Sequence, residues 1–211
     1  MDFKYKEVNK APVVWSDNFF NEDEVNLIHN ECHRLNTLGI LQAETGGAYV
    51  EKTNIKTGKV EQEHLSKNNG CFLEKVFASE MRLCDTVDIF RNKIHRSKQF
   101  HDMMAEMHPY FVTLKQNSGT STLLSYYDSA DHYKGHRDGS FVTVLFWFYN
   151  EPKSFTGGDF VIENELTISC KRGRVVFMPG FLLHEVTPIQ MKEEDQGKTR
   201  GRYTVSQFIG R

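Results

Sequence analysis

Residues 127–149, YDSADHYKGHRDGSFVTVLFWFY, join a polar strand pattern to the longest apolar run of the chain. Successive side chains of a strand point to opposite faces, so His136 and Asp138 share a face from which Arg137 turns away. With a second imidazole, such a pair completes a facial two-histidine, one-carboxylate site that suits a non-haem ferrous ion. The apolar run at residues 141–149 predicts a central strand that is covered on both sides.

The overall composition excludes several classes of partner. The 211 residues suit a single domain, and 26 Lys and Arg against 28 Asp and Glu leave a formal net charge of −2. No stretch combines basic and aromatic residues as a nucleic-acid groove requires. The apolar run is too short to span a membrane, and the N-terminus MDFKYKEVNK lacks the apolar core of a secretory signal. We therefore expect a cytoplasmic protein with neither a nucleic-acid nor a membrane partner.

The pattern of apolar residues changes near residue 110, from helical to strand-like. Asn21 and Glu24 form a capping-box pattern at the start of a helix expected over residues 21–36, and residues 74–92 and 97–107 have further helical patterns. Strands are expected at residues 111–115, 122–127, 141–149, 159–162, 166–169, 174–177 and 202–209. This order predicts an α+β, mainly β fold: a double-stranded β-helix, or jelly roll, with the N-terminal helices packed on one outer face.

The second imidazole must come from one of the other histidines. Most of them lie on or beside helical patterns, namely His29, His33, His95, His101 and His108, where a packing or surface role is the usual one. His64 lies in a polar loop, and His132 falls in the turn before its strand. His184 follows the apolar strand GRVVFMPGFLL and precedes EVTPI, so it can face His136 across a jelly roll. Four separated cysteines without a CxxC pair argue against a zinc site and predict buried, reduced thiols.

Several short motifs follow one another along the second half of the chain. They read YxxAxxYxxHxD at residues 127–138, GGDF at 157–160, GRVVF at 173–177, HEVTPI at 184–189 and GRYTVSQF at 201–208. An HxD alone is weak evidence, but this ordered set resembles the Fe(II)- and 2-oxoglutarate-dependent dioxygenases, specifically the prolyl-4-hydroxylase-like branch. The resemblance spans residues 123–208. Upstream, KNNGCFLEKVF at residues 67–77 is similar to a segment of uncharacterised prokaryotic members.

This resemblance implies an enzyme, with a role for each matching residue. It makes His136, Asp138 and His184 the ligands of Fe(II), with 2-oxoglutarate and O2 as cosubstrates and ascorbate as an optional addition. It places Arg202 on the distal carboxylate of 2-oxoglutarate. Tyr127 and Tyr133 match the two tyrosines ahead of the HxD, and Tyr127 is the better candidate to reach the cosubstrate. The carboxylate at Asp138 indicates hydroxylation, because related halogenases carry a small residue there.

The choice of Arg202 also has a physical basis. A diacid that chelates iron through its keto-acid end leaves its other carboxylate buried, and a guanidinium binds it with two parallel charged hydrogen bonds. Thr204 shares the strand face of Arg202 and adds a hydroxyl beside it. Arg200 has the same parity and is the rival, but Gly201 indicates that the strand begins after Arg200.

Two features depart from the family pattern. The segment between His184 and Arg202 is long and carries the charged insertion QMKEEDQGKT, which predicts a solvated hairpin. Where many relatives carry a tyrosine that contacts the cosubstrate, this chain has Trp147 and Phe148, which supply no phenol.

The resemblance divides the chain into a helical support with a lid loop, residues 1–110, and a jelly-roll catalytic core, residues 111–211. The polar segment at residues 43–69 and the insertion at residues 190–199 are expected to face a small-molecule or peptide substrate. A prolyl residue or an amino-acid-like molecule is the substrate that the branch implies. Two alternatives stay open: a cupin-like metal-binding jelly roll without 2-oxoglutarate turnover, and a non-catalytic binding module.

Overall fold

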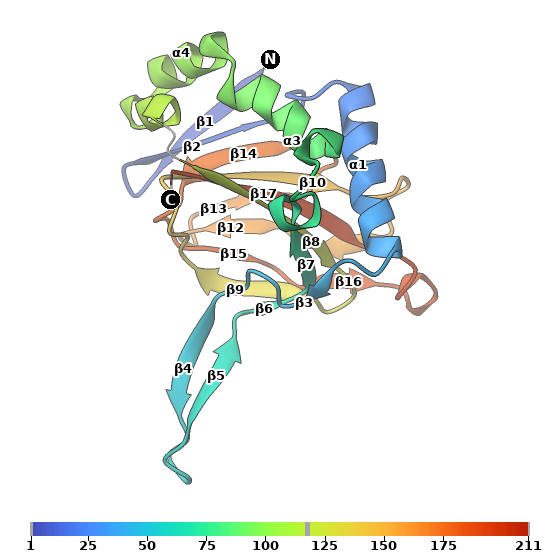
Figure 1. The fold of residues 1–211 in the computed structure, drawn as a ribbon. Helices are drawn as coiled ribbons and strands as arrows, with labels where there is room; N and C mark the ends of the chain where they lie inside the picture. Colours follow the sequence, from blue (N-terminus) through green and yellow to red (C-terminus); the bar gives the residue numbers. More distant parts are fainter. Residues whose placement is uncertain (1, 117–118, 211) are drawn as a thin grey trace.

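The computed structural model describes residues 2–116 and 119–210. Two antiparallel sheets form its body, with the helices gathered over the outer face of the larger sheet (Figure 1). The larger sheet has, in spatial order, β1 (Phe3–Val8), β2 (Ala11–Ser16), β14 (Val175–Pro179), β10 (Val142–Phe148), β17 (Arg202–Ile209), β8 (Thr120–Tyr127), β7 (Asn69–Phe72) and β3 (Gln42–Ala43). The predicted mainly β jelly roll with helices on one outer face is confirmed.

The smaller sheet covers the inner face of the larger one. Its strands, in spatial order, are β13 (Leu166–Ile168), β12 (Phe160–Ile162), β15 (His184–Val186), β9 (His132–His136) and β6 (Ser66–Lys67). Two two-stranded pairs complete the β-structure: β11 (Phe155–Gly157) with β16 (Ile189–Met191), and β4 (Tyr49–Thr53) with β5 (Val60–His64).

Strand β10 lies near the middle of the larger sheet, between β14 and β17, and all of its residues are buried. Val144 and Phe146 belong to the core under the helices, whereas Leu145 and Trp147 belong to the core between the two sheets. The apolar run therefore forms the doubly covered central strand that the sequence predicts, because a strand between two apolar layers needs apolar side chains on both faces.

Helix α1 (Glu22–Thr37) begins where the sequence predicts. The side chain of Asn21 accepts a hydrogen bond from the backbone N–H of Glu24, and the Glu24 carboxylate accepts one from the N–H of Asn21. This reciprocal capping box satisfies two backbone donors that the helix itself cannot pair. The buried face of α1 includes Val25, Ile28 and Cys32.

The other helical segments are shorter. They are α2 (Leu73–Val76), α3 (Asp85–Phe90), the π-helical η2 (Arg91–His95), α4 (Lys98–Met107), and the 3-10 turns η1 (Met81–Leu83), η3 (Pro109–Gln116) and η4 (Glu193–Asp195). Helix α4 matches its prediction and starts at the side-chain cap of Ser97. The helix expected over residues 74–92 is instead divided into α2, η1, α3 and the first residues of η2, with Cys84 extended between η1 and α3.

Two expectations for the strands were wrong. Residues 111–115 are helical, not extended: Phe111 and Leu114 are both buried, three residues apart, which is the spacing of a 3-10 turn. The region before residue 110 is also less helical than expected, because β1 and β2 form one edge of the larger sheet. Charged residues on β1, namely Lys4, Lys6 and Glu7, weaken its apolar pattern, as is common on edge strands.

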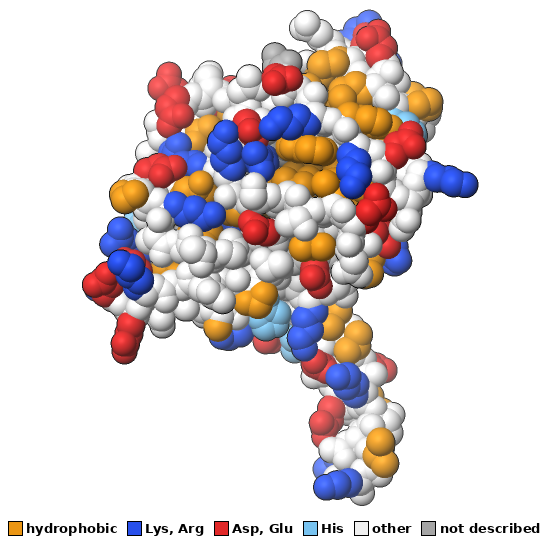
Figure 2. Space-filling view, turned by 180° about the vertical axis from the view of Figure 1, so that it is seen from behind, with side chains coloured by type: hydrophobic (Ala, Val, Ile, Leu, Met, Phe, Trp, Pro, Cys, Tyr) orange, Lys and Arg blue, Asp and Glu red, His pale blue; other side chains and the backbone are white. Residues whose placement is uncertain are grey.

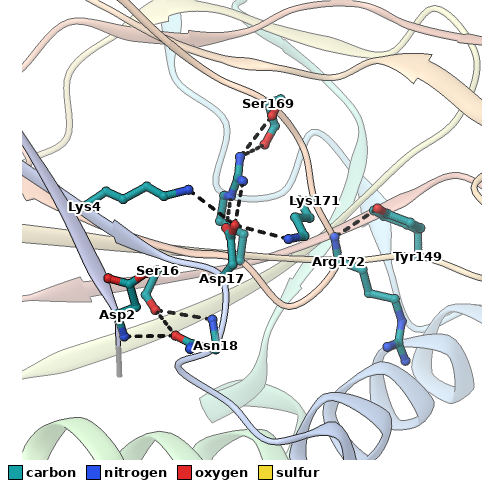
Figure 3. Close-up of polar contacts among 10 residues, drawn as sticks. Asp2, Lys4, Ser16, Asp17, Asn18, Tyr149, Ser169, Lys171 and Arg172 are labelled. Carbon is teal, nitrogen blue, oxygen red and sulfur yellow. Dashed lines mark hydrogen bonds and ion pairs between the residues drawn. The ribbon is translucent and has the colours of Figure 1, made fainter.

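The N-terminal strands are joined to the body by charges around Asp17, shown in Figure 3. The guanidinium of Arg174 donates from Nε and Nη2 to the Asp17 carboxylate, and Lys171 Nζ donates at 3.2 Å. These cations hold the pKa of Asp17 well below its usual range, with the Arg174 hydrogen bond as the main cause. Asp17 follows β2 directly and Arg174 precedes β14, so the ion pair supports the pairing of these two strands.

The segment at residues 43–69 contains the hairpin of β4 and β5, which projects from the body into solvent (Figures 1 and 2). Residues 46–64, called the arm below, are thus largely exposed and do not fold over the sheets as a lid. Ile55, at the turn of the arm, is 99% exposed. Lys134 on β9 binds Glu63 on β5 at 2.6 Å, which ties the base of the arm to the smaller sheet.

All four cysteines are buried and free. No helix in the described part of the chain has the length and apolar character to cross a membrane.

A buried histidine on α1 predicts an acid-sensitive fold. Burial lowers the pKa of His29 to about 4, and nearby Arg172 and His33 act in the same direction. Because the folded pKa lies below the unfolded value of about 6.5, the unfolded chain binds more protons between these values, and stability is lost as pH falls through this window. We expect His29→Phe to remove about 1–2 kcal/mol of the loss between pH 7 and pH 5. Urea unfolding of both proteins at the two pH values measures it, and equal losses would contradict the assignment.

Candidate metal centre

Three side chains with metal-binding atoms meet between the two sheets. The ligand atoms of His136, Asp138 and His184 all lie within 4.8 Å of one another. Nε2 of His136 is 3.6 Å from Oδ1 of Asp138, and Nε2 of His184 is 3.5 Å from Oδ2. These side chains are no more than 10% exposed. The structure thus brings together the three residues that the sequence selected, and it is the one such cluster among the described residues.

Strand pairing explains how His184 reaches the pair. β15 and β9 are antiparallel neighbours, and His184 lies directly opposite His136 in their register. Their rings are 4.2 Å apart between centroids. Asp138 follows the end of β9 and is fixed by its backbone N–H, which donates to the carbonyl of Gly180 at 2.8 Å.

Backbone carbonyls orient both imidazoles. Nδ1 of His136 lies 3.0 Å from the carbonyl oxygen of Lys134, and Nδ1 of His184 lies 2.9 Å from that of Leu182. A ring nitrogen in this position carries the proton and donates it to the carbonyl, which leaves the Nε2 lone pair free for a metal. Both Nε2 atoms point to the Asp138 carboxylate, so the donor set and the tautomers fit a divalent transition metal.

Hydroxyl groups orient the carboxylate. Thr143 on β10 donates from Oγ1 to Oδ2 of Asp138 at 2.7 Å, and Ser140 Oγ lies 2.9 Å from the same Thr143 oxygen. Thr143 is completely buried. Such outer partners fix the direction of a ligand and its basicity. The sequence reasoning missed both residues, although the strand parity of Thr143 with Leu145 and Trp147 is a signal for it.

The environment keeps His136 neutral. Burial lowers its pKa to about 4, and the neighbouring His184 adds to this effect, while Asp138 opposes it. A neutral imidazole is the form that binds a metal. The site is therefore ready to accept a cation at neutral pH without first losing a proton from His136.

A cavity of about 230 Å³ leads from the three ligands into the space between the sheets. The inner faces of β8, β10 and β17 form one wall, and β9, β12 and β15 form the other. Residues 46–48, at the base of the projecting arm, line its edge. Of the two segments expected to face the substrate, the arm therefore contributes only its base, whereas no residue of the 190–199 insertion lines this cavity.

Arg202 lies in this cavity and is completely buried. Its Nε and Nη2 donate to the hydroxyl of Thr204 at 3.0 and 2.7 Å, and its Nη1 donates to the carbonyl of Gly158. The guanidinium carbon lies 4.5 Å from the centre of the Tyr127 ring. No carboxylate of the described residues is within ion-pair distance of it. A buried cation of this kind requires an anion.

The glycine pair of the GGDF motif has a clear role here. Gly157 and Gly158 have φ values of 69° and 70°, a left-handed conformation that glycine adopts readily. This backbone directs the Gly158 carbonyl to Arg202. A side chain on Gly158 would also lie 3.4 Å from the guanidinium.

Comparison with solved structures agrees with this architecture. No protein-family model and no curated protein matches the sequence. A prolyl-4-hydroxylase from Pseudomonas putida superposes with a TM-score of 0.55 at 16% identity, over 94% of this chain and 92% of the other. An oxidoreductase of the 2OG-Fe(II) oxygenase family from Burkholderia pseudomallei gives 0.51 at 11% identity, over 94% and 84%. The chain has the fold of a 2OG-Fe(II) oxygenase. At these identities the likeness establishes the fold.

Within this oxygenase fold, the two tyrosines lie at different places. Tyr127 is buried at the Arg202 end, opposite Arg202 in the pairing of β8 and β17, and burial raises its pKa. Tyr133 stacks on the His136 ring at 3.6 Å, and its hydroxyl accepts a hydrogen bond from the N–H of Ala48. Tyr133 therefore supports a ligand and the base of the arm, and Tyr127 lies nearer to the buried cation.

The rival residues lie outside the cavity of the oxygenase fold. Arg200 is partly exposed and forms an ion pair with Asp195 at 2.6 Å, so it compensates a charge of the insertion. His132 points Nδ1 to the carbonyl of Ala130 and lines no part of the cavity. Arg137, by contrast, is among the residues that line the cavity, although its half-exposed side chain also forms an ion pair with Glu163 at 3.2 Å.

Proposed function

We propose that this protein is an Fe(II)- and 2-oxoglutarate-dependent dioxygenase that hydroxylates an unactivated C–H bond. The observation that carries the proposal is the buried Arg202, which has no anionic partner among the described residues and lies in the same cavity as His136, Asp138 and His184. A 2-oxo diacid can bind both the metal site and Arg202, because its keto acid is a metal chelator and its second carboxylate pairs with a guanidinium. A metal site alone has no need for such an arginine.

The residues of the chain have distinct tasks in this proposal. His136, Asp138 and His184 hold the iron, and Thr143 and the backbone carbonyls orient them. Arg202, supported by Thr204 and Gly158, holds the distal carboxylate. Bound iron and 2-oxoglutarate together supply the activation of O2, with 2-oxoglutarate converted to succinate and CO2.

The alternative is a cupin-like jelly roll that binds a metal without turning over 2-oxoglutarate. Aerobic incubation with Fe(II) and 2-oxoglutarate, followed by measurement of succinate, separates the two. We expect slow succinate release without any primary substrate and faster release with the right one. Normal Fe(II) binding with no succinate across the substrates tried would rule out the dioxygenase.

The primary substrate is proposed to be a prolyl residue of a peptide or a small amino-acid-like molecule. The wall of the cavity formed by β8 and β17 combines the hydroxyls of Ser125 and Ser206 with the apolar side chains of Leu123 and Phe208. This mixture suits an uncharged, partly apolar group next to the metal. A screen of succinate release against peptides and free amino acids tests this class directly.

The projecting arm is proposed to hold the substrate rather than the cosubstrate. Replacing residues 51–62 by Asn-Gly joins Val50 to Glu63, which are paired in the register of β4 and β5, and keeps the contact of Glu63 with Lys134. We expect substrate oxidation to fall at least about 10-fold while substrate-free succinate release persists, because only residues 46–48 reach the cavity. Loss of both activities in a folded variant would contradict this role.

A further inference from the structure

Trp147 on β10 carries a buried donor without a partner. The residue is completely buried and lines the cavity, yet its indole Nε1–H has no hydrogen-bond partner among the described residues. Leaving a buried donor unpaired costs about 1–3 kcal/mol, so such groups are rare unless a ligand completes them. An indole N–H is a donor only, and its partner must therefore be an acceptor.

The position of Trp147 indicates which acceptor this is. Trp147 lies directly opposite Thr204 in the pairing of β10 and β17, and Thr204 holds the Arg202 guanidinium. The guanidinium carbon is 5.9 Å from the centre of the indole ring. The unpaired N–H and the uncompensated cation thus belong to neighbouring side chains at one end of the cavity, away from the metal ligands.

The unpaired N–H of Trp147 and the buried charge of Arg202 can be satisfied by one and the same group. A guanidinium has five N–H groups, and the Thr204 and Gly158 bonds occupy three of those of Arg202, so two remain. A carboxylate accepts about four hydrogen bonds and carries the charge that the buried cation lacks. One carboxylate at this end of the cavity can therefore satisfy both residues at once, whereas a neutral acceptor leaves the cation uncompensated.

We propose that the Nε1–H of Trp147 donates a hydrogen bond to the distal carboxylate of a 2-oxo diacid, and that Trp147 with Arg202 makes the site specific for a diacid. This inference rests on the proposed function, to which it adds Trp147 as a residue that selects a diacid over other 2-oxo acids. Trp147 stands on the central strand of the sheet, where Phe146 and Phe148 on either side of it pack into the opposite core. Its ring is held between two sheets, so the donor is preorganised before the ligand arrives.

Matched ligands test the bond. 2-Oxoglutarate and 2-oxopentanoate share five carbons and the keto-acid end, but the second has a methyl group in place of the distal carboxylate. Calorimetric titration of the Mn(II)-loaded protein without O2 measures binding of each. We expect Trp147→Phe to weaken 2-oxoglutarate binding about 10- to 100-fold and to change 2-oxopentanoate binding less than about 2-fold. Equal weakening of both ligands would reduce Trp147 to a packing residue, and no weakening of either would overturn the inference.

Fluorescence gives a second readout that needs no change at position 147. The chain has two tryptophans. The other one, Trp15, lies on β2, which is separated from β10 by β14 in the order of the sheet. In Trp15→Phe, the emission of Trp147 should change on addition of 2-oxoglutarate and saturate with the calorimetric affinity; an unchanged emission would count against direct contact. A wild-type protein that binds Mn(II) but not 2-oxoglutarate would overturn the proposed function itself, which separates that failure from one confined to Trp147.

Discussion

Asp138→Ala is expected to abolish tight Fe(II) binding and to lower succinate release more than about 100-fold, a larger loss than the roughly 10- to 100-fold typical of removing an outer partner of a metal ligand. Asp138 is the one carboxylate of the cluster, and both imidazole Nε2 atoms lie within 3.6 Å of its oxygens. Without Asp138, only two neutral imidazole nitrogens remain as ligands, and no ligand charge compensates the bound Fe(II). Anaerobic Fe(II) titration and succinate formation measure the two effects.

A matched control is available four residues before His136. His132→Ala removes an imidazole from the same strand, but His132 lies outside the cavity, so metal affinity and turnover should stay within about 2-fold of the wild type. His184→Ala should behave like Asp138→Ala. If Asp138→Ala retained full Fe(II) affinity in a folded protein, the three residues would not form the metal site.

The second large effect is expected at Arg202. Arg202→Met should weaken 2-oxoglutarate binding by about 100-fold or more, because a bidentate charged contact with a buried guanidinium is lost. The same change should leave the ligand-free protein no less stable, since it removes a completely buried cation that no carboxylate of the described residues compensates. This combination of weaker binding with preserved stability identifies a residue kept for a ligand rather than for the fold. Calorimetry and urea unfolding measure the two quantities.

Arg200→Met is the matched control. Arg200 is partly exposed and paired with Asp195, so this variant should keep its affinity for 2-oxoglutarate. The opposite result, with Arg200→Met impaired and Arg202→Met normal, would transfer the carboxylate site to the rival residue. Arg202→Lys should be intermediate, since it retains the charge but not the planar fork.

Local patterns predicted the parts of the fold that depend on neighbouring residues. The capping box at Asn21 and Glu24 defined the start of α1, and the apolar run defined β10, because each involves contacts within one element or a single burial environment. Parity placed His136 and Asp138 on one side of the chain. Motif order then selected His184 and Arg202.

The wrong expectations have a common cause. Residues 111–115 are rich in strand-forming types, but Phe111 and Leu114 are buried three residues apart in a 3-10 turn. β1 has a weak apolar pattern and exists through its pairing with β2. Strand formation depends on partners distant in sequence, which a local pattern does not record.

The sequence by itself determined the ligand types, their parity and the central strand, because these are properties of single residues and of their immediate spacing. The sequence also favoured His184 as the partner of His136 and Arg202 over Arg200, and the structure adds the register of β15 with β9 and the burial of Arg202. Tertiary structure alone decided that the indole N–H of Trp147 has no partner among the described residues. The physical reason is that burial and hydrogen-bond satisfaction belong to the packed environment and not to the residue.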